Sequence, residues 1–349
     1  MNETQLTSRQ EKILSLLSTQ PISRVELAQK LSNLYQPSKT TLYRDLKKLQ
    51  SLGLVKSIGQ SKSIKYISLE NPLVKQVSLQ SYFETDSTLR HQTKTSFDFE
   101  VFEHLVEIIN DREEDELSLT LKNLSVQQTK LDPTIFKREL ERFIIEFSWK
   151  SSHIEGNTYT LLETEILIKQ HKAAVGRSKY ETNMVLNHKQ ALDYILEHRQ
   201  EFKQLTLVKI LTLHDLLIQD LNISQGIRRQ PVAITGTNYV PLTNSTSLQV
   251  ALEKTITVIN QVKFPVSKAL IAVSMVAYIQ PFADGNKRTS RVLANAILIA
   301  YDLYPLSYRN TDELEYLKAV LLFYEQNNLY HLKRIFLEQL EFATNNYFQ

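Results

Sequence analysis

The sequence has 349 residues, of which 42% are hydrophobic and 23% charged, values typical of a soluble globular protein with two or three domains. The low glycine content, seven residues in all, favours a fold of helices joined by short loops. The absence of cysteine excludes disulfides and thiolate metal sites. The polar N-terminus and the lack of a long apolar run lead us to expect a cytoplasmic protein without a membrane partner. A net charge of +3 is too small to indicate a nucleic-acid partner by itself.

Residues 1–70 have the pattern of a small domain with three short helices followed by two strands. Apolar residues share one helical face over 8–18, Ser23 is placed to cap a second helix, and Ser38 and Gly53 bound a third. Two segments of alternating polarity then flank a turn. This order resembles a winged helix-turn-helix of the bacterial repressor type, whose third helix would enter the major groove of DNA.

Basic and hydroxyl side chains gather on the exposed face of that third helix and along the wing. Cations on such a face bind phosphates, whereas short hydroxyl and aromatic side chains reach base edges. We therefore predict that the domain binds DNA through Lys39, Thr40, Thr41, Tyr43, Arg44, Lys47 and Lys62. Winged helices also mediate protein contacts or dimerise, so a homodimer is the alternative use of this domain.

Residues 71–132 are expected to form a helical connector. Its first part has no clear periodicity, and its second part predicts one or two amphipathic helices with a solvated acidic turn, 112-REEDE-116. The connector carries no pattern that we associate with chemistry.

Residues 133–150 predict an amphipathic helix that leads into the stretch SSHIEGN. Ser151 and Glu155 are four residues apart, so they share a helical face. Gly156 and Asn157 are expected to end the helix. Taken alone, this stretch predicts only a corner between two helices.

The segment 279-IQPFADGNKRTSR-291 joins two helices that are apolar on nearly every face. A Gly/Asn turn before a helix N-terminus presents backbone N–H groups to an anion, and the helix dipole adds positive potential. Lys287, Arg288 and Arg291 add full charges, so the segment predicts a site for a di- or triphosphate. Phosphate would repel Asp284 unless a divalent cation bridged them, which predicts a Mg²⁺–nucleotide ligand.

Together these motifs resemble the Fic family, whose core is the Fido fold. QPFADGNKRTSR is similar to the Fic signature His-Pro-Phe-x-Asp/Glu-Gly-Asn-Gly-Arg-x-x-Arg, and SSHIEGN to the family's inhibitory-helix pattern. GIRRQPVAITGTNYVP resembles its Gly-x-x-Arg segment and β-hairpin flap, and the resemblance extends over residues 135–340. It implies a Fic domain over 133–349 with an inhibitory helix near 148–157. The expected fold is therefore mainly α, a Fic/Fido helical core with a small β-hairpin flap, preceded by an α+β winged-helix domain.

The resemblance also implies an activity, namely transfer of AMP from ATP to a Ser, Thr or Tyr hydroxyl of a protein target. Asp284 would hold Mg²⁺ against the phosphates, and Arg291 would hold the γ-phosphate. The further residues implied at the nucleotide are Gly285, Asn286 (with its side chain), Lys287 and Arg288 around the phosphates, Thr235 and Gly236 in the flap, and Tyr316 beside the adenine.

Two other roles follow from the same resemblance. The flap, Ile234–Tyr239, would align a target peptide as an added strand. The inhibitory segment, with Ser151, Glu155, Gly156 and Asn157, would place Glu155 against Arg291 and so displace the γ-phosphate.

At two positions the sequence departs from the Fic signature. Gln280 occupies the position of the family histidine, which takes the proton of the attacking hydroxyl, and a glutamine cannot take it. Lys287 replaces the usual glycine and resembles the Doc toxins, which bind the nucleotide reversed and phosphorylate their target. We therefore expect an ATP-binding protein whose AMP transfer is impaired. The alternatives are a catalytically silent ATP-sensing DNA-binding regulator and a Doc-like protein kinase.

Overall fold

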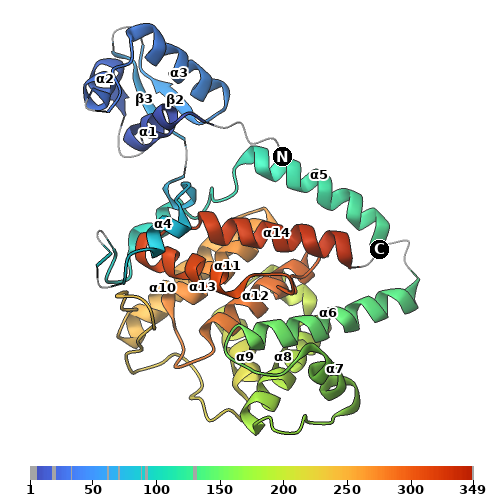
Figure 1. Cartoon of the computed structure of the whole chain (residues 1–349). Helices are drawn as coiled ribbons and strands as arrows, with labels where there is room; N and C mark the ends of the chain where they lie inside the picture. The colour runs from blue at the N-terminus through green and yellow to red at the C-terminus, as the bar shows by residue number, and fades with distance from the viewer. Residues whose placement is uncertain are drawn as a thin grey trace. The chain divides into compact units, whose positions relative to one another are not determined.

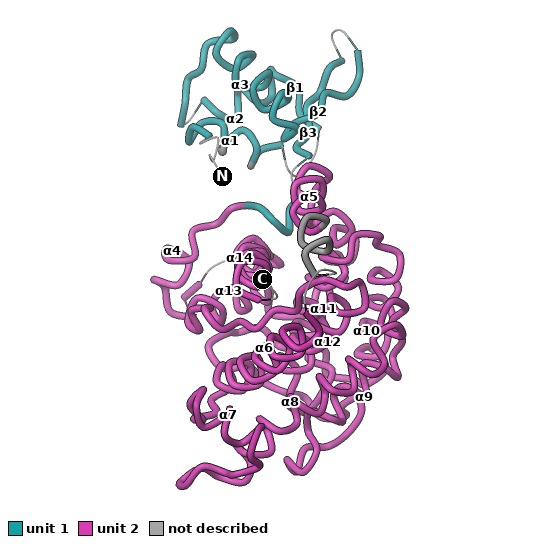
Figure 2. The backbone as a smooth tube through the Cα atoms, turned by 90° about the vertical axis from the view of Figure 1, so that its right-hand side faces the viewer, with its two compact units in different colours: residues 1–75 teal, residues 76–349 magenta. Residues whose placement is uncertain are grey.

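The computed structural model describes residues 6–17, 21–32, 34–60, 63–69, 71–87, 89–90, 93–128 and 132–347 (Figure 1). The chain divides into two compact units, unit 1 (residues 1–75) and unit 2 (residues 76–349), which Figure 2 colours separately. In the part of the chain that the structure describes, no helix combines the length and apolar character needed to cross a bilayer.

Unit 1 contains the three predicted helices and two predicted strands, together with one additional short strand. Its elements are α1 (Ser8–Leu17), β1 (Ile22–Ser23), α2 (Arg24–Leu31), α3 (Lys39–Ser51), β2 (Val55–Ile58), β3 (Lys65–Ser68) and the 3₁₀ helix η2 (Pro72–Val74). The sheet has the order β1-β3-β2, and both strand pairs are antiparallel.

The helix ends in unit 1 follow from local chemistry. Ser23 and Glu26 form a reciprocal capping box at the start of α2, and the Ser38 side chain accepts the backbone N–H of Thr41 at the start of α3. Gly53 ends α3 with a φ of +71°, a conformation that favours glycine. The apolar faces thus fixed form one core, which includes Ile13, Leu17, Leu27, Leu31, Leu42, Leu46, Leu49, Val55 and Tyr66.

A buried carboxylate joins two of these helices. Asp45 of α3 is 5% exposed, and its oxygens accept hydrogen bonds from Arg9 Nε at 2.6 Å and Gln10 Nε2 at 2.9 Å, both in α1. Because a buried carboxylate is costly unless it is paired, these contacts fix how α3 lies on α1. They leave the opposite face of α3 exposed, with Lys39, Tyr43, Arg44 and Lys47 on it.

Unit 2 is helical in all the regular structure described. Its elements are α4 (Leu79–Phe83), the 3₁₀ helix η3 (Phe99–His104), α5 (Asp111–Gln128), α6 (Pro133–His153), α7 (Leu161–Gln170), α8 (Lys179–Glu197), the 3₁₀ helix η4 (Arg199–Lys203), α9 (Leu207–Ile218), α10 (Ser245–Gln261), α11 (Pro265–Ile279), α12 (Asn286–Ala300), α13 (Glu313–Gln326) and α14 (Tyr330–Asn346). The predicted acidic turn 112–116 is instead part of α5, because acidic side chains are favourable in the first turn of a helix.

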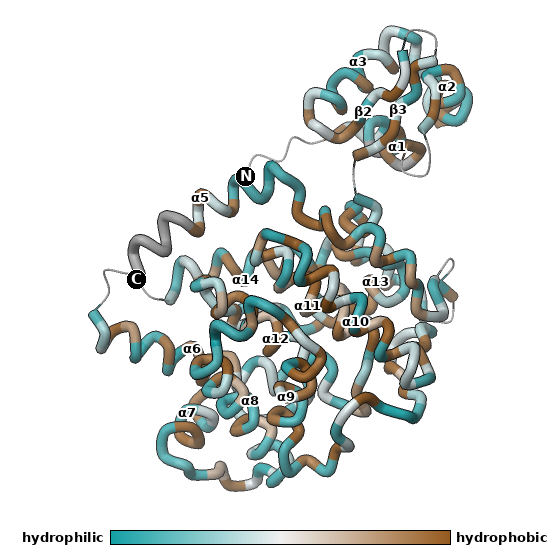
Figure 3. Tube along the Cα trace, turned by 180° about the vertical axis from the view of Figure 1, so that it is seen from behind, coloured by the Kyte–Doolittle hydropathy of each residue, from teal (hydrophilic) through white to brown (hydrophobic). Residues whose placement is uncertain are grey.

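Helices α11 and α12 form the centre of unit 2. They pack against each other, and α12 also contacts α6, α8, α9 and η4. Every residue from Val266 to Ile279 is buried, and in α12 every residue except Lys287 is buried. Figure 3 shows hydrophobic residues along both helices. The loop between them is therefore held at both ends by the most tightly enclosed part of the fold.

The N-terminal part of unit 2 packs onto this helical core. Glu325 of α13 is 1% exposed and forms an ion pair with Arg90 at 2.9 Å and a hydrogen bond from the Tyr82 hydroxyl at 2.6 Å. The ring of Phe97 stacks on Tyr278 of α11, with centroids 4.6 Å apart. These contacts make Tyr82, Arg90 and Phe97 a structural part of the helical core.

The predicted β-hairpin at Ile234–Tyr239 is absent, and the prediction was wrong on this point. These residues form a loop with a turn at Thr235 and Gly236, followed by a single parallel bridge between Val240 and Ser96. The reason is that other segments take the hydrogen bonds of the loop. Arg90 donates to the Gly236 carbonyl at 2.8 Å, and the Asn238 side chain donates to the Ser87 carbonyl at 2.7 Å.

Candidate functional site

The loop between α11 and α12, residues 280–285, is called the anion loop here. It begins at Gln280, which has a φ of +53°, and ends at Gly285, which has a φ of +80° and is the N-cap of α12. A Cβ atom at Gly285 would make only ordinary contacts, 3.4 Å from the Arg288 guanidinium and 3.5 Å from Ile218, so it is the positive φ that favours glycine here. The first backbone N–H groups of a helix have no acceptor within the helix, so those of α12 are available for the predicted anion.

Three side chains hold the anion loop from the inside. Phe282 is fully buried and stacks on His214 of α9, with centroids 3.7 Å apart. His214 Nε2 lies 3.1 Å from the Asp284 carbonyl, and burial lowers the pKa of His214 to about 4, so its ring is neutral at pH 7 and donates from this nitrogen. The Asn286 side chain makes two hydrogen bonds to the backbone of Phe282, at 2.8 and 2.9 Å.

Arg228 joins the anion loop to the segment that contains the predicted flap. Its guanidinium donates to the carbonyls of Gln280 at 2.7 Å, Gln230 at 2.7 Å and Leu242 at 2.6 Å. Its backbone N–H donates to the Pro281 carbonyl at 2.9 Å. One buried side chain therefore fixes both the start of the anion loop and the two ends of the neighbouring segment.

Gln280 is 8% exposed, and its side chain is engaged within the protein. Nε2 donates to the Ala277 carbonyl at 2.7 Å and to the Tyr324 hydroxyl at 3.2 Å. A side-chain amide has no proton-accepting nitrogen near neutral pH. In this position Gln280 stabilises the end of α11.

The basic side chains of α12 contact two carboxylates. Arg288 is 2% exposed and pairs with Asp284 at 3.1 Å, while the side chain of Asp284 stays 58% exposed. Glu155, just after α6, pairs with Arg291 at 3.0 Å and with Lys287 at 2.9 Å. Burial opposes ionisation of Glu155, but Arg291 and Lys287 outweigh it and hold the pKa of Glu155 below its usual value. Glu155 is therefore a carboxylate anion at neutral pH.

Arg291 is fully buried and has further partners besides Glu155. Its Nε donates to the Ser151 hydroxyl at 3.0 Å, one Nη donates to the Ser151 carbonyl at 2.8 Å, and the other Nη lies 3.4 Å from the Tyr316 hydroxyl. The Ser151 hydroxyl also lies 3.0 Å from Nε2 of His188 in α8, which is buried. Burial lowers the pKa of His188 to about 3, so the ring is neutral at pH 7. Since Nδ1 donates to the Met184 carbonyl at 2.8 Å, Nε2 accepts a hydrogen bond from the Ser151 hydroxyl.

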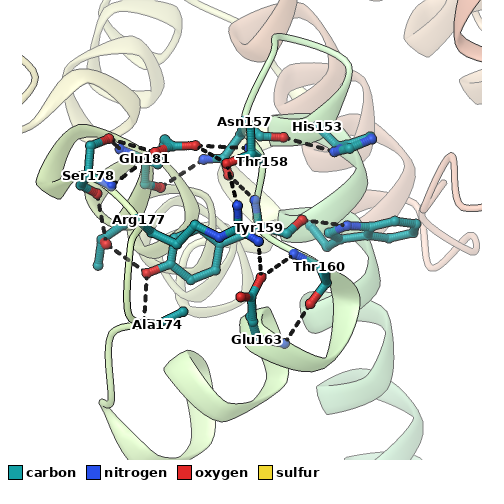
Figure 4. A network of polar contacts seen from close by, with 12 residues as sticks. His153, Asn157, Thr158, Tyr159, Thr160, Glu163, Ala174, Arg177, Ser178 and Glu181 are labelled. Carbon is teal, nitrogen blue, oxygen red and sulfur yellow. Dashed lines mark hydrogen bonds and ion pairs between the residues drawn. The ribbon is translucent and has the colours of Figure 1, made fainter.

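The turn that carries Glu155 is anchored by a separate polar network (Figure 4). Gly156, three residues after the end of α6, has a φ of +90° and lies in the turn that follows this helix. The Glu181 carboxylate of α8 accepts hydrogen bonds from the backbone and hydroxyl of both Thr158 and Ser178, and these hydrogen bonds lower the pKa of Glu181 to about 2. Asn157 Nδ2 donates to the Glu181 carbonyl at 2.8 Å. The network fixes the chain on the C-terminal side of Glu155.

Comparison with known proteins identifies the family of this site. Residues 204–298, which include α9, the Arg228 segment, α11, the anion loop and most of α12, match the model of the Fic/DOC family. The chain contains a Fic/DOC family domain. The predicted resemblance to the Fic family and the predicted mainly α fold are thereby confirmed, whereas the winged helix and the inhibitory helix stay predictions.

Curated relatives of the Fic domain include two animal proteins. A protein adenylyltransferase Fic of Nematostella vectensis is 28% identical over 189 residues, which cover 52% of this chain and 43% of the relative. A protein adenylyltransferase Fic of Aedes aegypti is 31% identical over 172 residues, which cover 47% of this chain and 34% of the relative. The chain thus spans less than half the length of these curated relatives.

Solved structures give the same fold. A Fic domain containing signaling protein from Bacteroides thetaiotaomicron has a TM-score of 0.54 and 24% identity, covering 66% of this chain and 95% of that chain. Fic-1 from C. elegans has a TM-score of 0.53 and 16% identity, covering 93% of this chain and 91% of that chain.

The structure brings together many of the residues that the sequence singled out in the Fic domain. Ser151, Glu155, Lys287, Arg291 and Tyr316 form one contacting group. Asp284, Gly285 and Arg288 lie in the adjoining turn. The side chains of unit 1 that were assigned to DNA are exposed on α3, except for the half-buried Thr41 and for Lys62, which lies outside the described residues.

Two of the predicted side chains have partners within the protein. Both polar atoms of the Asn286 side chain bind the backbone of Phe282. Tyr316 is 1% exposed, packs edge-on against Tyr308 and lies beside Arg291. Their contacts with a nucleotide stay predictions. Thr235 and Gly236 form a turn over Leu321 of α13, and Gly236 contacts Arg90.

Sequence reasoning missed three residues that position this site. Arg228 lies in the recognised Gly-x-x-Arg stretch, but nothing in its pattern indicated three carbonyl partners. Glu181 completes a capping box with Ser178, which predicts a helix start and no contact with the Glu155 turn. His188 had no signal, since a lone histidine on a helix indicates no particular partner.

Replacing Arg228 by Met is expected to loosen the segment 228–242, because three carbonyls lose their donor at a cost of about 1–3 kcal/mol. Hydrogen–deuterium exchange of these residues should rise by about tenfold or more. The exposed neighbour Arg229 is the matched control, and Arg229→Met should leave the exchange unchanged. Equal exchange in the two variants would contradict the role given to Arg228.

Glu181→Gln is expected to destabilise unit 2 by about 1 kcal/mol at pH 7, because four solvent-exposed N–H and O–H donors lose their shared carboxylate. A lowered pKa means that this contribution is complete above the usual value of 4.5 and disappears as the pH falls toward about 2. Thermal unfolding should therefore show a constant difference from the natural chain between pH 8 and pH 5 and a shrinking one below. The exposed Glu197 of α8 provides the control variant, Glu197→Gln, for which no difference is expected.

Proposed function

We propose that this chain binds ATP with Mg²⁺ at the anion loop and transfers AMP to a Ser, Thr or Tyr hydroxyl of a protein target. Transfer is suppressed in the resting protein by Glu155, and it is slow because Gln280 stands in place of a general base. The adenylyltransferase names of the curated relatives support the reaction type.

The observation that carries the proposal is a carboxylate bound where an anion is expected. Glu155 contacts two cations of the first turns of α12, beside a helix N-terminus that faces the same loop. Such a place binds negative charge, and a phosphate chain has the charge and oxygen atoms to replace the carboxylate. Nucleotide binding and the contact of Glu155 are therefore alternatives at one site.

Asp284 fits the proposed metal. Its side chain is 58% exposed at the mouth of the loop, and Mg²⁺ in nucleotide sites is held by one or two carboxylates together with phosphate oxygens. Among the described residues there is no group of three His, Asp or Glu side chains that would bind a metal without the nucleotide. When bound, Mg²⁺ neutralises charge on the phosphates.

The transfer step requires a base for the proton of the target hydroxyl, and Gln280 cannot act as this base. The target oxygen bonds to the α-phosphorus, diphosphate leaves, and the hydroxyl proton must go to a base. The Gln280 amide donates hydrogen bonds to Ala277 and Tyr324 and offers no basic nitrogen. The loss of a positioned base reduces a rate by about 10²–10⁴-fold.

We further propose that unit 1 binds DNA. Arg44 and Lys47 on the exposed face of α3 are placed to contact phosphates, and Tyr43, which is 44% exposed, carries Lys47 and Arg24 near its ring. Lys56 and Lys65 extend the same basic character along β2 and β3. This side-chain set supports phosphate contacts together with base-edge contacts.

In a Glu155→Gln background, Gln280→His is expected to raise AMP transfer by about 10²–10⁴-fold, because a base is restored to the site. The measurement uses ATP labelled at the α- or at the γ-phosphate, with label on protein as the readout. The control Glu155→Gln/Gln280→Ala should gain nothing. Protein labelled only from γ-labelled ATP would instead indicate protein phosphorylation. Protein labelled from neither ATP would refute a transferase and indicate a regulator that only binds ATP.

Lys47→Gln should weaken binding to a duplex taken from upstream of the gene and reduce the dependence of log affinity on log salt by about 1. Fluorescence anisotropy between low and physiological salt measures both quantities. The control is Lys172→Gln, an exposed lysine of unit 2. Affinity that does not fall with added salt would contradict phosphate binding by α3.

A further inference from the structure

The two oxygens of Glu155 contact two different cations. Oε1 lies 3.0 Å from Arg291 and Oε2 lies 2.9 Å from Lys287. Lys287 and Arg291 are four residues apart in α12 and therefore lie on the same face of the helix. The two cations converge on one point, which Glu155 occupies.

We propose that Lys287 is a second cation for the terminal phosphate of a nucleoside triphosphate, in addition to Arg291, to which the family resemblance already assigns that phosphate. Glu155 fills this site in the resting protein by contacting both cations at once. The inference rests on the proposed ATP site and makes Lys287 the residue that gives the site its preference for a triphosphate over a monophosphate.

The two cations differ in freedom of movement. Arg291 has no solvent exposure, and Ser151 and Tyr316 hold it from other directions, so its guanidinium stays in place when Glu155 leaves. Lys287 is the one residue of α12 that is not buried, with a side chain 27% exposed on four rotatable bonds. It can follow the anion, whether this is a carboxylate or a phosphate.

The charge of the site favours a phosphate once Glu155 is displaced. Without Glu155, the side chains of Arg291 and Lys287 would face each other with two positive charges beside the N-terminus of α12. A terminal phosphate carries more negative charge than a carboxylate and more oxygens to accept hydrogen bonds. A nucleoside monophosphate has no group that reaches this point while its only phosphate lies in the loop.

Removing Lys287 affects both anions that compete for this site, the Glu155 carboxylate and the terminal phosphate. It weakens the hold on Glu155, which favours nucleotide binding, and it removes one ligand of the terminal phosphate, which opposes binding. The two effects act against each other in the natural chain. A background that lacks the charge of Glu155 separates them, because only the second effect remains.

Isothermal titration with ATP and with AMP, both in the presence of Mg²⁺, tests the proposal on the full chain. Glu155→Gln is expected to bind ATP more tightly than the natural chain does. Lys287→Met in this background should lower ATP affinity by about tenfold, the size expected for one charge-assisted contact, and leave AMP affinity unchanged. Lys287→Arg in the same background keeps the charge and should retain most of the ATP affinity, which controls for misfolding.

The matched control is Lys263→Met in the Glu155→Gln background. Lys263 is exposed and precedes α11, whereas the anion loop follows it, so the length of that helix separates the two. This variant should bind ATP and AMP as its parent does.

Two results would overturn the role of Lys287, namely ATP affinity unchanged by Lys287→Met, or an equal loss for ATP and AMP. Failure of Glu155→Gln to bind ATP at all would overturn the nucleotide site and this role with it. Absence of AMP transfer with ATP binding intact would refute only the proposed reaction, because the titration does not depend on transfer.

Discussion

Arg291 carries a full positive charge at a position without solvent exposure, on a helix that forms the centre of unit 2. Such a charge is tolerated only when partners surround it, and α6 supplies them through the hydroxyl and carbonyl of Ser151 and, just beyond its end, through Glu155. His188 in turn orients the Ser151 hydroxyl. The need to pair one guanidinium thus links α6, α8 and α12 and determines where an anion can bind.

The site combines rigid and adjustable parts. The anion loop is fixed by Phe282, Asn286 and Arg228, so its backbone N–H groups keep their directions whether or not a ligand is present. Glu155 and Lys287 lie at the rim, partly exposed, and form an ion pair at 2.9 Å, while Arg291 binds the other oxygen of Glu155. A preformed loop with a replaceable anion suits a protein that binds nucleotide only after an internal carboxylate has moved.

Much of this fold could be predicted from the sequence because local signals agreed with the final packing. Ser23, Ser38 and Gly53 bound the helices of unit 1, and apolar helices flank the charged anion loop as their composition required. The β-hairpin form of the flap was wrong because hydrogen bonds of this segment go to Ser87 and Thr95, far away in sequence. The internal contacts of Asn286 could not be predicted for a related reason, since an amide side chain can bind a ligand or its own loop, and the sequence does not distinguish these.

The contact between Arg90 and Glu325 bears on where the functional core of the chain begins. Glu325 is buried in α13, and the partners of its carboxylate, Tyr82 and Arg90, precede the family match at residue 204 by more than one hundred residues of sequence. A fragment cut near that match, or at residue 135 where the resemblance starts, would leave a buried carboxylate without its cation and the Gly236 carbonyl without its donor. A piece of this chain that keeps both partners of the Glu325 carboxylate therefore starts before residue 82, well outside the segment by which the family is recognised.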